Sequence, residues 1–307
     1  MIISASSLGD CVSQAVDLCA NQTQMNLVIE SRIPVPTRDE FIMAYRDKAR
    51  DWQASARPRH LKFNHGEYIF RHGDALAFLE NELSRKATSN RACISLVDGR
   101  DIMGSGDGAL PSLMIIQAGF QPSSQETLYV TAYFRALEVQ QFLPINLAEL
   151  TLLADRLASR FPTISHADLT LFAFRAHLNP GFGTHMVAEI DQATRDDIVT
   201  AVGHGVSRKK WDTVTAWLVD KRRRESVIDT QGLATLATEL GSTGTPTGPR
   251  GPGEAEAGRA ASAVAAAVAE LTQLEVARSN GTHGSTLDTL QQTFEEHLDE
   301  AVRRLSG

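Results

Sequence analysis

Cysteine is scarce in this chain, where Cys11, Cys19 and Cys93 are the only three. Their number is odd, and none belongs to a Cys-x-x-Cys pair or to a Cys and His ligand spacing. The sequence therefore predicts neither a disulfide framework nor a zinc site, and no other metal site is indicated. We expect the three thiols to be buried.

Long apolar runs and an excess of basic residues are also lacking. No run reaches the ~18 apolar residues of a membrane span, and the N-terminus has no basic segment followed by an apolar one. We therefore predict a cytoplasmic protein that has no membrane partner. The net charge of −7 argues against nucleic acid as the main partner. A hydrophobic content of 42% with 22% charged residues is typical of a globular chain of one large domain or two.

The hydrophobic period changes in the middle of residues 128–161. The first part alternates between apolar and polar residues, which predicts a strand with Arg135 displayed near its end. After Pro144 the apolar residues recur at helical spacing. Asn146 and Glu149 have the spacing of a capping box, with Asn in place of Ser or Thr, and predict the first turn of this helix.

This order of strand, polar loop and capped helix resembles the thymidylate synthase family. The family motif reads roughly Gln-Arg-Ser-x-Asp and then Pro-Phe-Asn-Ile-Ala. The matching residues here, without a gap, are Phe134, Arg135, Ala136, Glu138, Pro144, Ile145, Asn146, Leu147 and Ala148. The resemblance covers roughly residues 74–180. It implies an α/β (α+β) fold with a thymidylate synthase-like sheet covered by helices on one side, commonly paired back-to-back with the sheet of a second subunit.

The predicted strand 112–119 departs from the family at its reactive residue. In the synthases this strand begins Pro-Cys-His and has a Gln five residues after the Cys, whereas this chain has Pro111, Ser112 and Leu113, with Gln117 in the Gln position. The family attacks carbon 6 of a pyrimidine ring with a thiolate, which a Cys of pKa ~8.5 supplies when a nearby Arg lowers that pKa. A serine hydroxyl needs an adjacent general base instead, and none is evident. Ser112 therefore occupies the position of the family's catalytic Cys, but it has neither a thiolate nor an evident general base.

Other family positions are partly retained. Two consecutive arginines hold the phosphate of the partner subunit's nucleotide in the family, and Asn90 and Arg91 stand in their places. A later strand ends Asp-x-His-x-Tyr in the family, and here it carries Arg175, His177 and Asn179. A histidine in a strand is commonly structural, but its place in the motif favours a nucleotide contact. The resemblance thus implies that a dUMP- or dCMP-like pyrimidine nucleotide is held by Arg91, Gln117, Arg135, Asn146 and His177.

Four segments are predicted along the chain. They are a thymidylate synthase-like domain at 1–205, a helical extension at 206–240, a flexible linker at 241–258 and a C-terminal helical hairpin at 259–307. Gly, Thr, Pro and Ser dominate the linker. The apolar stripe of the hairpin either packs on its own domain, docks a protein partner or self-associates.

The basic run from Lys221 to Arg224 ends a predicted helix. We interpret it as a solvated helix end, where cations complement the helix dipole. A nucleic-acid patch is the alternative, although no series of aromatic residues accompanies the run.

Two classes of function remain open. The first is a catalytically impaired, homodimeric relative that binds or senses a pyrimidine nucleotide, or serves as a scaffold, with no cofactor. The second is an active transferase that methylates or hydroxymethylates such a nucleotide from methylene-tetrahydrofolate, with Ser112 in an unrecognised role. A third option is nucleic-acid binding through residues 208–224. We favour the first, because the family's catalytic glutamate, like its Cys, has no clear counterpart; the nearest candidate, Glu40, lies in a polar first turn.

Overall fold

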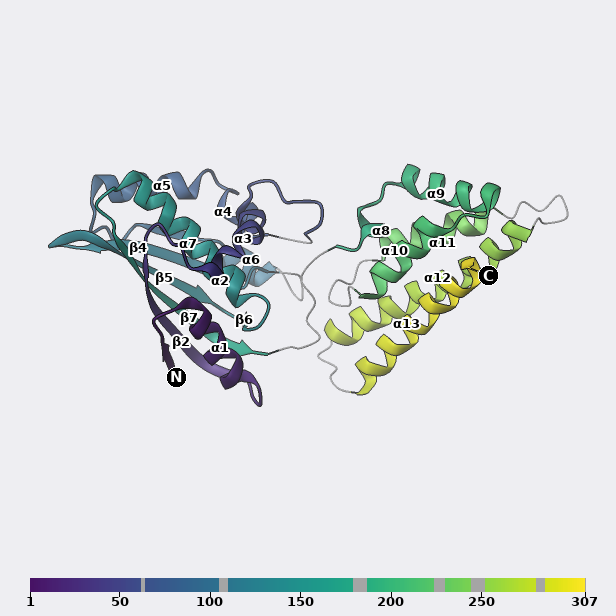
Figure 1. Cartoon of the computed structure of the whole chain (residues 1–307), viewed down its shortest axis with the longest axis horizontal. Helices are drawn as coiled ribbons and strands as arrows, with labels where there is room; N and C mark the ends of the chain where they lie inside the picture. Colours follow the sequence, from purple (N-terminus) through teal and green to yellow (C-terminus); the bar gives the residue numbers. More distant parts are fainter. Residues whose placement is uncertain are drawn as a thin grey trace. The chain divides into compact units, whose positions relative to one another are not determined.

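The chain divides into two compact units (Figure 1). We call Met1–Pro58 with Phe63–Phe182 the α/β unit, and Arg59–Lys62 with Gly183–Gly307 the helical unit. A computed structural model describes residues 1–61, 64–104, 110–178, 187–223, 230–243, 252–279 and 285–306. Each unit has its own hydrophobic core.

The α/β unit is built on a seven-stranded mixed sheet. Its main path runs β1-β2-β7-β5-β4-β3, and the short β6 pairs with β7. The strands β2 and β7 are antiparallel, β7 and β5 are parallel, and β5 and β4 form an antiparallel hairpin. The bounds are β1 (Ile2–Ser4), β2 (Gln24–Pro34), β3 (Cys93–Ser95), β4 (Leu113–Gln121), β5 (Ser124–Phe134), β6 (Leu137–Glu138) and β7 (His166–His177).

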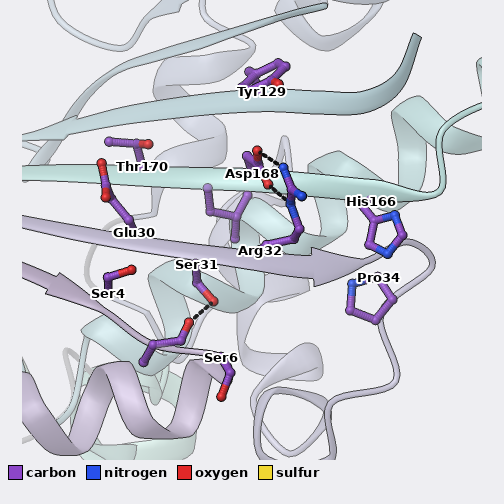
Figure 2. A pocket seen from close by; sticks show the side chains of 12 residues that line it. Ser4, Ser6, Glu30, Ser31, Arg32, Pro34, Tyr129, His166, Asp168 and Thr170 are labelled. Atoms are coloured by element: carbon purple, nitrogen blue, oxygen red, sulfur yellow. Dashed lines mark hydrogen bonds and ion pairs between the residues drawn. The ribbon is translucent and has the colours of Figure 1, made fainter. Parts of the chain in front are cut away.

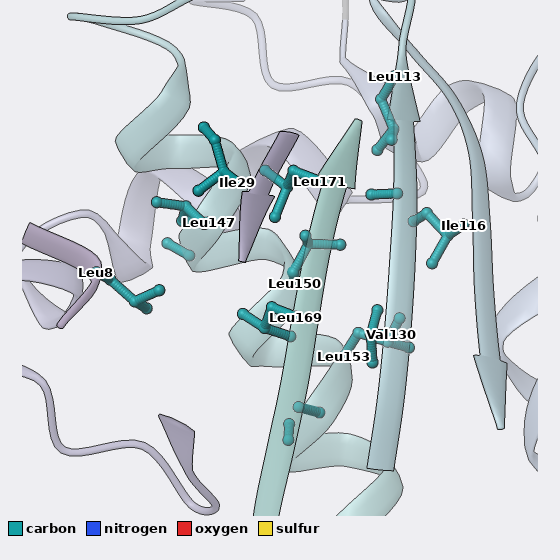
Figure 3. Packing of buried hydrophobic residues seen from close by; sticks show 14 of the residues in the cluster. Leu8, Ile29, Leu113, Ile116, Val130, Leu147, Leu150, Leu153, Leu169 and Leu171 are labelled. Atoms are coloured by element: carbon teal, nitrogen blue, oxygen red, sulfur yellow. The ribbon is translucent and has the colours of Figure 1, made fainter. Parts of the chain in front are cut away.

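Helices cover one face of this sheet. They are α1 (Leu8–Cys19), α2 (Glu40–Met43), α3 (Arg46–Gln53), α4 (His65–Ile69), α5 (Ala75–Arg85) and α7 (Leu143–Arg160), while the described residues of the short α6 (Gly99–Gly104) do not belong to this core. Alternation along β5 and β7 turns the apolar side chains toward the helices, and Figure 3 shows Leu147, Leu150 and Leu153 of α7 beside Leu169 and Leu171 of β7. The polar side chains of the same strands lie on the opposite face, which we call the open face. The mixed α/β prediction is therefore confirmed.

The start of α7 differs from its prediction. The helix is preceded by Phe142, which makes no side-chain cap. Instead, the carboxylate of Glu138 accepts the backbone N–H groups of residues 140–142, at 3.1, 2.5 and 3.2 Å. Asn146 and Glu149 consequently lie inside the helix, where they are 4% and 0% exposed. The predicted capping box is wrong, because an upstream carboxylate already satisfies the first N–H groups of this segment.

The helical unit contains α8 (Glu189–Gln192), α9 (Arg195–Arg208), α10 (Asp212–Arg223), α11 (Gln231–Ser242), α12 (Pro252–Ser279) and α13 (Ser285–Ser306). Its boundaries differ from those predicted. The limit at residue 205 falls within α9, and the linker 241–258 overlaps the end of α11 and the start of α12, while residues 244–251 lie outside the described part. Proline is compatible with the first turn of a helix, so α12 begins within the Gly- and Pro-rich segment.

The apolar stripe of the last two helices is buried within their own unit. The helix α12 packs along α13 and α11, and α13 also contacts α10. Phe294 and Leu298 are 2% and 1% exposed in the resulting core. This packing corresponds to the first of the three alternatives for residues 259–307.

The basic run of α10 is not a solvated helix end throughout. Lys221 is 2% exposed, and its Nζ lies 2.5 Å from Oδ2 of the buried Asp191. The next residue, Arg222, pairs with Asp299 at 2.7 Å. Arg224 lies outside the described residues. Carboxylates therefore pair with the first two cations of the run.

One described helix is long and apolar enough to cross a membrane by length and composition, although the sequence showed no uninterrupted apolar run. It is the segment Glu254–Ala277 of α12. Val264, Ala267 and Leu274 of this segment are buried in the core of the helical unit. Core helices pass the same test, so this is weak support for a membrane span.

Candidate functional site

Arg135 directly follows β5 and is fixed beside Ser112. Its backbone N–H donates to the Ser112 carbonyl at 2.9 Å. Its guanidinium donates through Nε to the Pro111 carbonyl at 3.2 Å and through Nη2 to the Leu110 carbonyl at 2.7 Å. The side chain is exposed, so main-chain carbonyls orient a charged group that remains open to solvent.

Ser112 itself has no activating partner among the residues that the structure describes. Its backbone carbonyl binds Arg135, but no histidine or carboxylate hydrogen-bonds to its hydroxyl within this part of the chain. A serine without a base stays protonated near neutral pH. The described residues therefore do not activate the Ser112 hydroxyl as a nucleophile.

Gln117 lies further along β4, on the open face of the sheet. It is opposite Cys93 in β3 and Thr131 in β5, and its Nε2 donates to the Asn90 carbonyl at 3.1 Å. A shallow hollow of about 370 Å³ includes Asn90, Gln117 and Thr131 in its lining. Five residues along a strand span about 16 Å, so the structure does not bring Gln117 together with Ser112.

Arg91 follows Asn90 and is exposed. Its charge contributes to lowering the pKa of Glu82, after the larger effects of hydrogen bonds from Arg85 and Ser89. The pair of places that carries two arginines in the family thus lies near Gln117 rather than near Arg135.

Asn146 is buried in the second turn of α7, and its amide makes no hydrogen bond with the described residues. Glu149 follows on the same helical face. Its carboxylate oxygens lie 3.0 and 2.9 Å from Nδ1 of His65, and both residues are almost fully buried. The ring of Trp52 meets His65 edge-on at 5.0 Å. The sequence did not indicate this buried pair, since no local pattern connects residues 84 positions apart.

His177 ends β7, opposite Glu138 of β6. Its Nδ1 is buried and has no hydrogen-bond partner in the described structure. Burial lowers the pKa of His177 below 6.5, the positive charge of Arg175 lowers it further, and Glu138 opposes both effects. The imidazole is therefore neutral at pH 7, with one ring nitrogen that a ligand hydroxyl could satisfy.

A larger hollow of about 940 Å³ lies elsewhere on the open face, over β1, β2 and β7. Figure 2 shows Glu30, Arg32 and Asp168 along its floor, with Tyr129 and His166 at its sides. Nε and Nη2 of Arg32 donate to the two Asp168 oxygens at 2.6 and 2.7 Å, so this cation is already paired. None of the predicted site residues lines this hollow. The sequence signal for this hollow was the alternation along β2, because it places Glu30 and Arg32 on the side of the strand that faces away from the core.

No group of three His, Cys, Asp or Glu side chains is placed to hold a metal ion in the described ranges. Cys11 and Cys19 are buried and Cys93 is half-buried, all three as free thiols. Burial raises the pKa of each thiol, so none is poised as a thiolate in place of Ser112. Neither the protein-family models nor the curated proteins contain a match to this chain.

Proposed function

We propose that the α/β unit is a thymidylate synthase-like scaffold that binds a pyrimidine nucleotide of the dUMP or dCMP type without transferring a one-carbon unit. In this role the protein senses the nucleotide and needs no cofactor. The observation that carries the proposal is the fixed, exposed cation of Arg135 beside Ser112.

Arg135 differs from the arginines that stabilise the fold. Arg46, Arg71 and Arg156, for example, donate to the carboxylates of Asp155, Asp101 and Glu80 at 2.7, 2.8 and 2.5 Å. The guanidinium of Arg135 contacts two uncharged carbonyls, and none of the described carboxylates pairs with it. A guanidinium that is held in place and not neutralised suits a phosphate, which it binds through parallel N–H donors.

Two further groups support a nucleotide as the ligand. The amide of Asn146 offers both donors and an acceptor, which is the complement of a pyrimidine edge. The unpartnered Nδ1 of His177 suits a sugar hydroxyl. Base, sugar and phosphate would thus each have a candidate partner in this chain.

The absence of catalysis is the second part of the proposal. Ser112 has no base within the described residues, and the thiols of the chain are protonated. The alternative remains an active transferase that uses methylene-tetrahydrofolate. Consumption of methylene-tetrahydrofolate by the purified protein in the presence of dUMP or dCMP, abolished by Ser112→Ala, would favour that alternative and refute ours.

Isothermal titration calorimetry with dUMP, dCMP, UMP and CMP tests the binding. Loss of a charge-assisted hydrogen bond is worth about 1.5–3 kcal/mol, so Arg135→Ala should weaken binding about 10- to 150-fold. Arg50→Ala is a matched control, since Arg50 is exposed on α3 and pairs with Asp47 of the same helix. Absence of binding by all four mononucleotides would refute the proposal.

The open face supports the expected homodimer. One apolar row crosses five strands in continuous register, formed by Ile2, Val28, Phe172, Tyr133 and Ile115. Tyr133 and Phe172 stack at 5.4 Å, while Ile2 and Ile115 are 66% and 40% exposed. An exposed apolar band rimmed by polar residues is typical of an interaction surface, and a second copy offers the same apolar band.

Light scattering tests this expectation. Ile115→Asp should convert the dimer to a monomer, because it places a charge in the apolar row. Phe78→Asp is the control, since Phe78 is 49% exposed but belongs to α5. A monomeric native protein, or an unchanged dimer in Ile115→Asp, would contradict the proposed interface.

A further inference from the structure

Two polar rows cross the open face of the α/β unit beside the apolar row. The first, which we call the polar row, runs across six strands in register and consists of Ser4, Glu30, Thr170, Thr131, Gln117 and Cys93. The second, which we call the charged row, lies two residues along each strand and consists of Arg32, Asp168, Tyr129 and Gly119. Figure 2 shows the part of both rows that crosses β2 and β7. A protein that covers the apolar row must therefore also satisfy these polar groups.

We propose that the second copy of the homodimer stacks on this face about a two-fold axis parallel to the strands, placed between β5 and β7. Each hollow of one copy is then closed by residues of the other. The inference rests on the proposed homodimer and specifies which residues of the two copies meet.

The strand arrangement is nearly symmetric about this axis. The border between β7 and β5 is the middle of the main path of the sheet. The central pair is parallel, and both flanking strands, β2 and β4, are antiparallel to it. A half-turn about an axis parallel to the strands keeps their directions and exchanges the two halves of the sheet. It places β2 over β4, β7 over β5 and β1 over β3 of the second copy, which is the aligned packing of two sheets.

The charges of the face are compatible with this axis. In the charged row, Asp168 of one copy would face Tyr129 of the other. The Asp168 carboxylate accepts from Arg32 at 2.6 and 2.7 Å and can accept a further hydrogen bond, while the Tyr129 hydroxyl makes none with the described residues. In the polar row, Glu30 would face the amide of Gln117. Every charged side chain of the two rows thus meets an uncharged residue.

Other two-fold axes are less favourable. An axis along β2 or β7 would set Glu30 or Asp168 against the same residue of the second copy, and like charges that face each other oppose association. An axis that follows the apolar row would place Thr170 over Phe174, which is 48% exposed. An axis between β2 and β7 avoids both conflicts but leaves Ile115 uncovered. The axis between β5 and β7 therefore covers the apolar row best without opposing charges.

The same rotation joins the two hollows across the interface. The smaller hollow lies at Gly119, where no side chain rises from β4, and its lining includes Gln117. The larger hollow of the second copy, with Arg32 on its floor, comes to lie over it. Nη1 of Arg32 and Oε1 of Gln117 make no hydrogen bond with the described residues. The donor of one copy can therefore bind the acceptor of the other.

Distances between nitroxide spin labels in the dimer test the position of the axis. Ser4→Cys and Ser95→Cys, each in a Cys93→Ser background, allow a label on β1 or on β3, the two borders of the sheet. Strands about 4.8 Å apart in sheets about 10 Å apart give about 26 Å between equivalent Cα atoms at both sites for the proposed axis. An axis between β2 and β7 gives about 18 Å at residue 4 and about 35 Å at residue 95, and an axis along a row gives less than about 20 Å at both.

Equal distances near the first value would support the proposed axis. Unequal distances, or short distances at both sites, would overturn it and leave the homodimer intact. A monomer in light scattering would refute the homodimer itself.

A second experiment tests the contact between Tyr129 and Asp168. Tyr129→Phe should raise the dissociation constant of the dimer at least about tenfold in analytical ultracentrifugation, because two equivalent hydrogen bonds to carboxylates are lost. Tyr133→Phe is the matched control, since Tyr133 would face Phe172 of the second copy, where its hydroxyl has no polar partner. A native dissociation constant in Tyr129→Phe, or an equal increase in Tyr133→Phe, would overturn the inference. Calorimetry with mononucleotides decides separately on nucleotide binding.

Discussion

The buried ion pair of the helical unit gives a prediction that can be worked out from the structure. The side chains of Lys221 and Asp191 are 2% and 1% exposed, with Nζ and Oδ2 2.5 Å apart. Removing one charge breaks this buried ion pair, which costs about 3–5 kcal/mol in the free energy of unfolding. Asp191→Asn should therefore lower the Tm of the helical unit by roughly 10–20 °C. Replacing both, as Asp191→Leu with Lys221→Met, should restore most of the stability, because such isosteric exchanges are often neutral.

Urea denaturation followed by tryptophan fluorescence measures this directly. Trp211 and Trp217 belong to the helical unit, and Trp52 belongs to the α/β unit. In a Trp52→Phe background the tryptophan fluorescence therefore comes from the helical unit alone. Arg223→Met is the matched control on an exposed position of α10. If the free energy of unfolding of Asp191→Asn lay within about 1 kcal/mol of that of the native protein, the reasoning would be refuted. The basic run would then behave as a solvated helix end.

Three further predictions concern the α/β unit. Gly66→Ala should destabilise it by at least about 2 kcal/mol in thermal or urea unfolding, because the new Cβ would overlap the Ala54 carbonyl; a native Tm would contradict the contact. The pKa of His177 is lowered by burial and then by Arg175, so below its ordinary value of 6.5 the unfolded chain takes up a proton first. The free energy of unfolding should therefore not be reduced by His177 above about pH 7, and it should fall as the pH decreases toward the folded pKa. This pH dependence should be weaker in His177→Gln, and an equal pH dependence in the two proteins would contradict the prediction. The affinity of Ser112→Ala for the nucleotide, measured by calorimetry, should lie within about threefold of the native affinity, because no contact is assigned to the Ser112 hydroxyl. A tenfold loss of affinity would show that this hydroxyl contacts the nucleotide.

Much of the α/β core could be predicted from local patterns. The alternation before Arg135 and the helical period after Pro144 predicted β5 and α7, and the family resemblance implied the later strand that is β7. The polar first turn that contains Glu40 belongs to the short helix α2, which Asp39 caps, and the chain turns before α3 begins. Propensity indicates that a segment is helical, but tertiary contacts decide where it breaks.

The candidate site was less predictable, because its contacts connect distant parts of the chain. Glu149 fits a capping box by spacing, yet it lies in the core because His65 is available there as a partner. The basic composition of its segment predicts Lys221 at the surface, but the ion pair with Asp191 places it in the core. In both cases the local pattern identified the chemistry of the side chain, while a partner far away in sequence determined its place. Gln117 and Arg135 were likewise assigned to one site, although they lie at different positions along the sheet.

The two outermost strands of the sheet have a consequence for how the protein assembles. Both β1 and β3 are only three residues long, so each border offers few free backbone groups to an incoming strand. Growth by strand addition at the borders, which produces fibres without a defined end, is therefore disfavoured. In the proposed homodimer, each copy covers the open face of the other, so no open face remains for a third copy and the assembly has a fixed size.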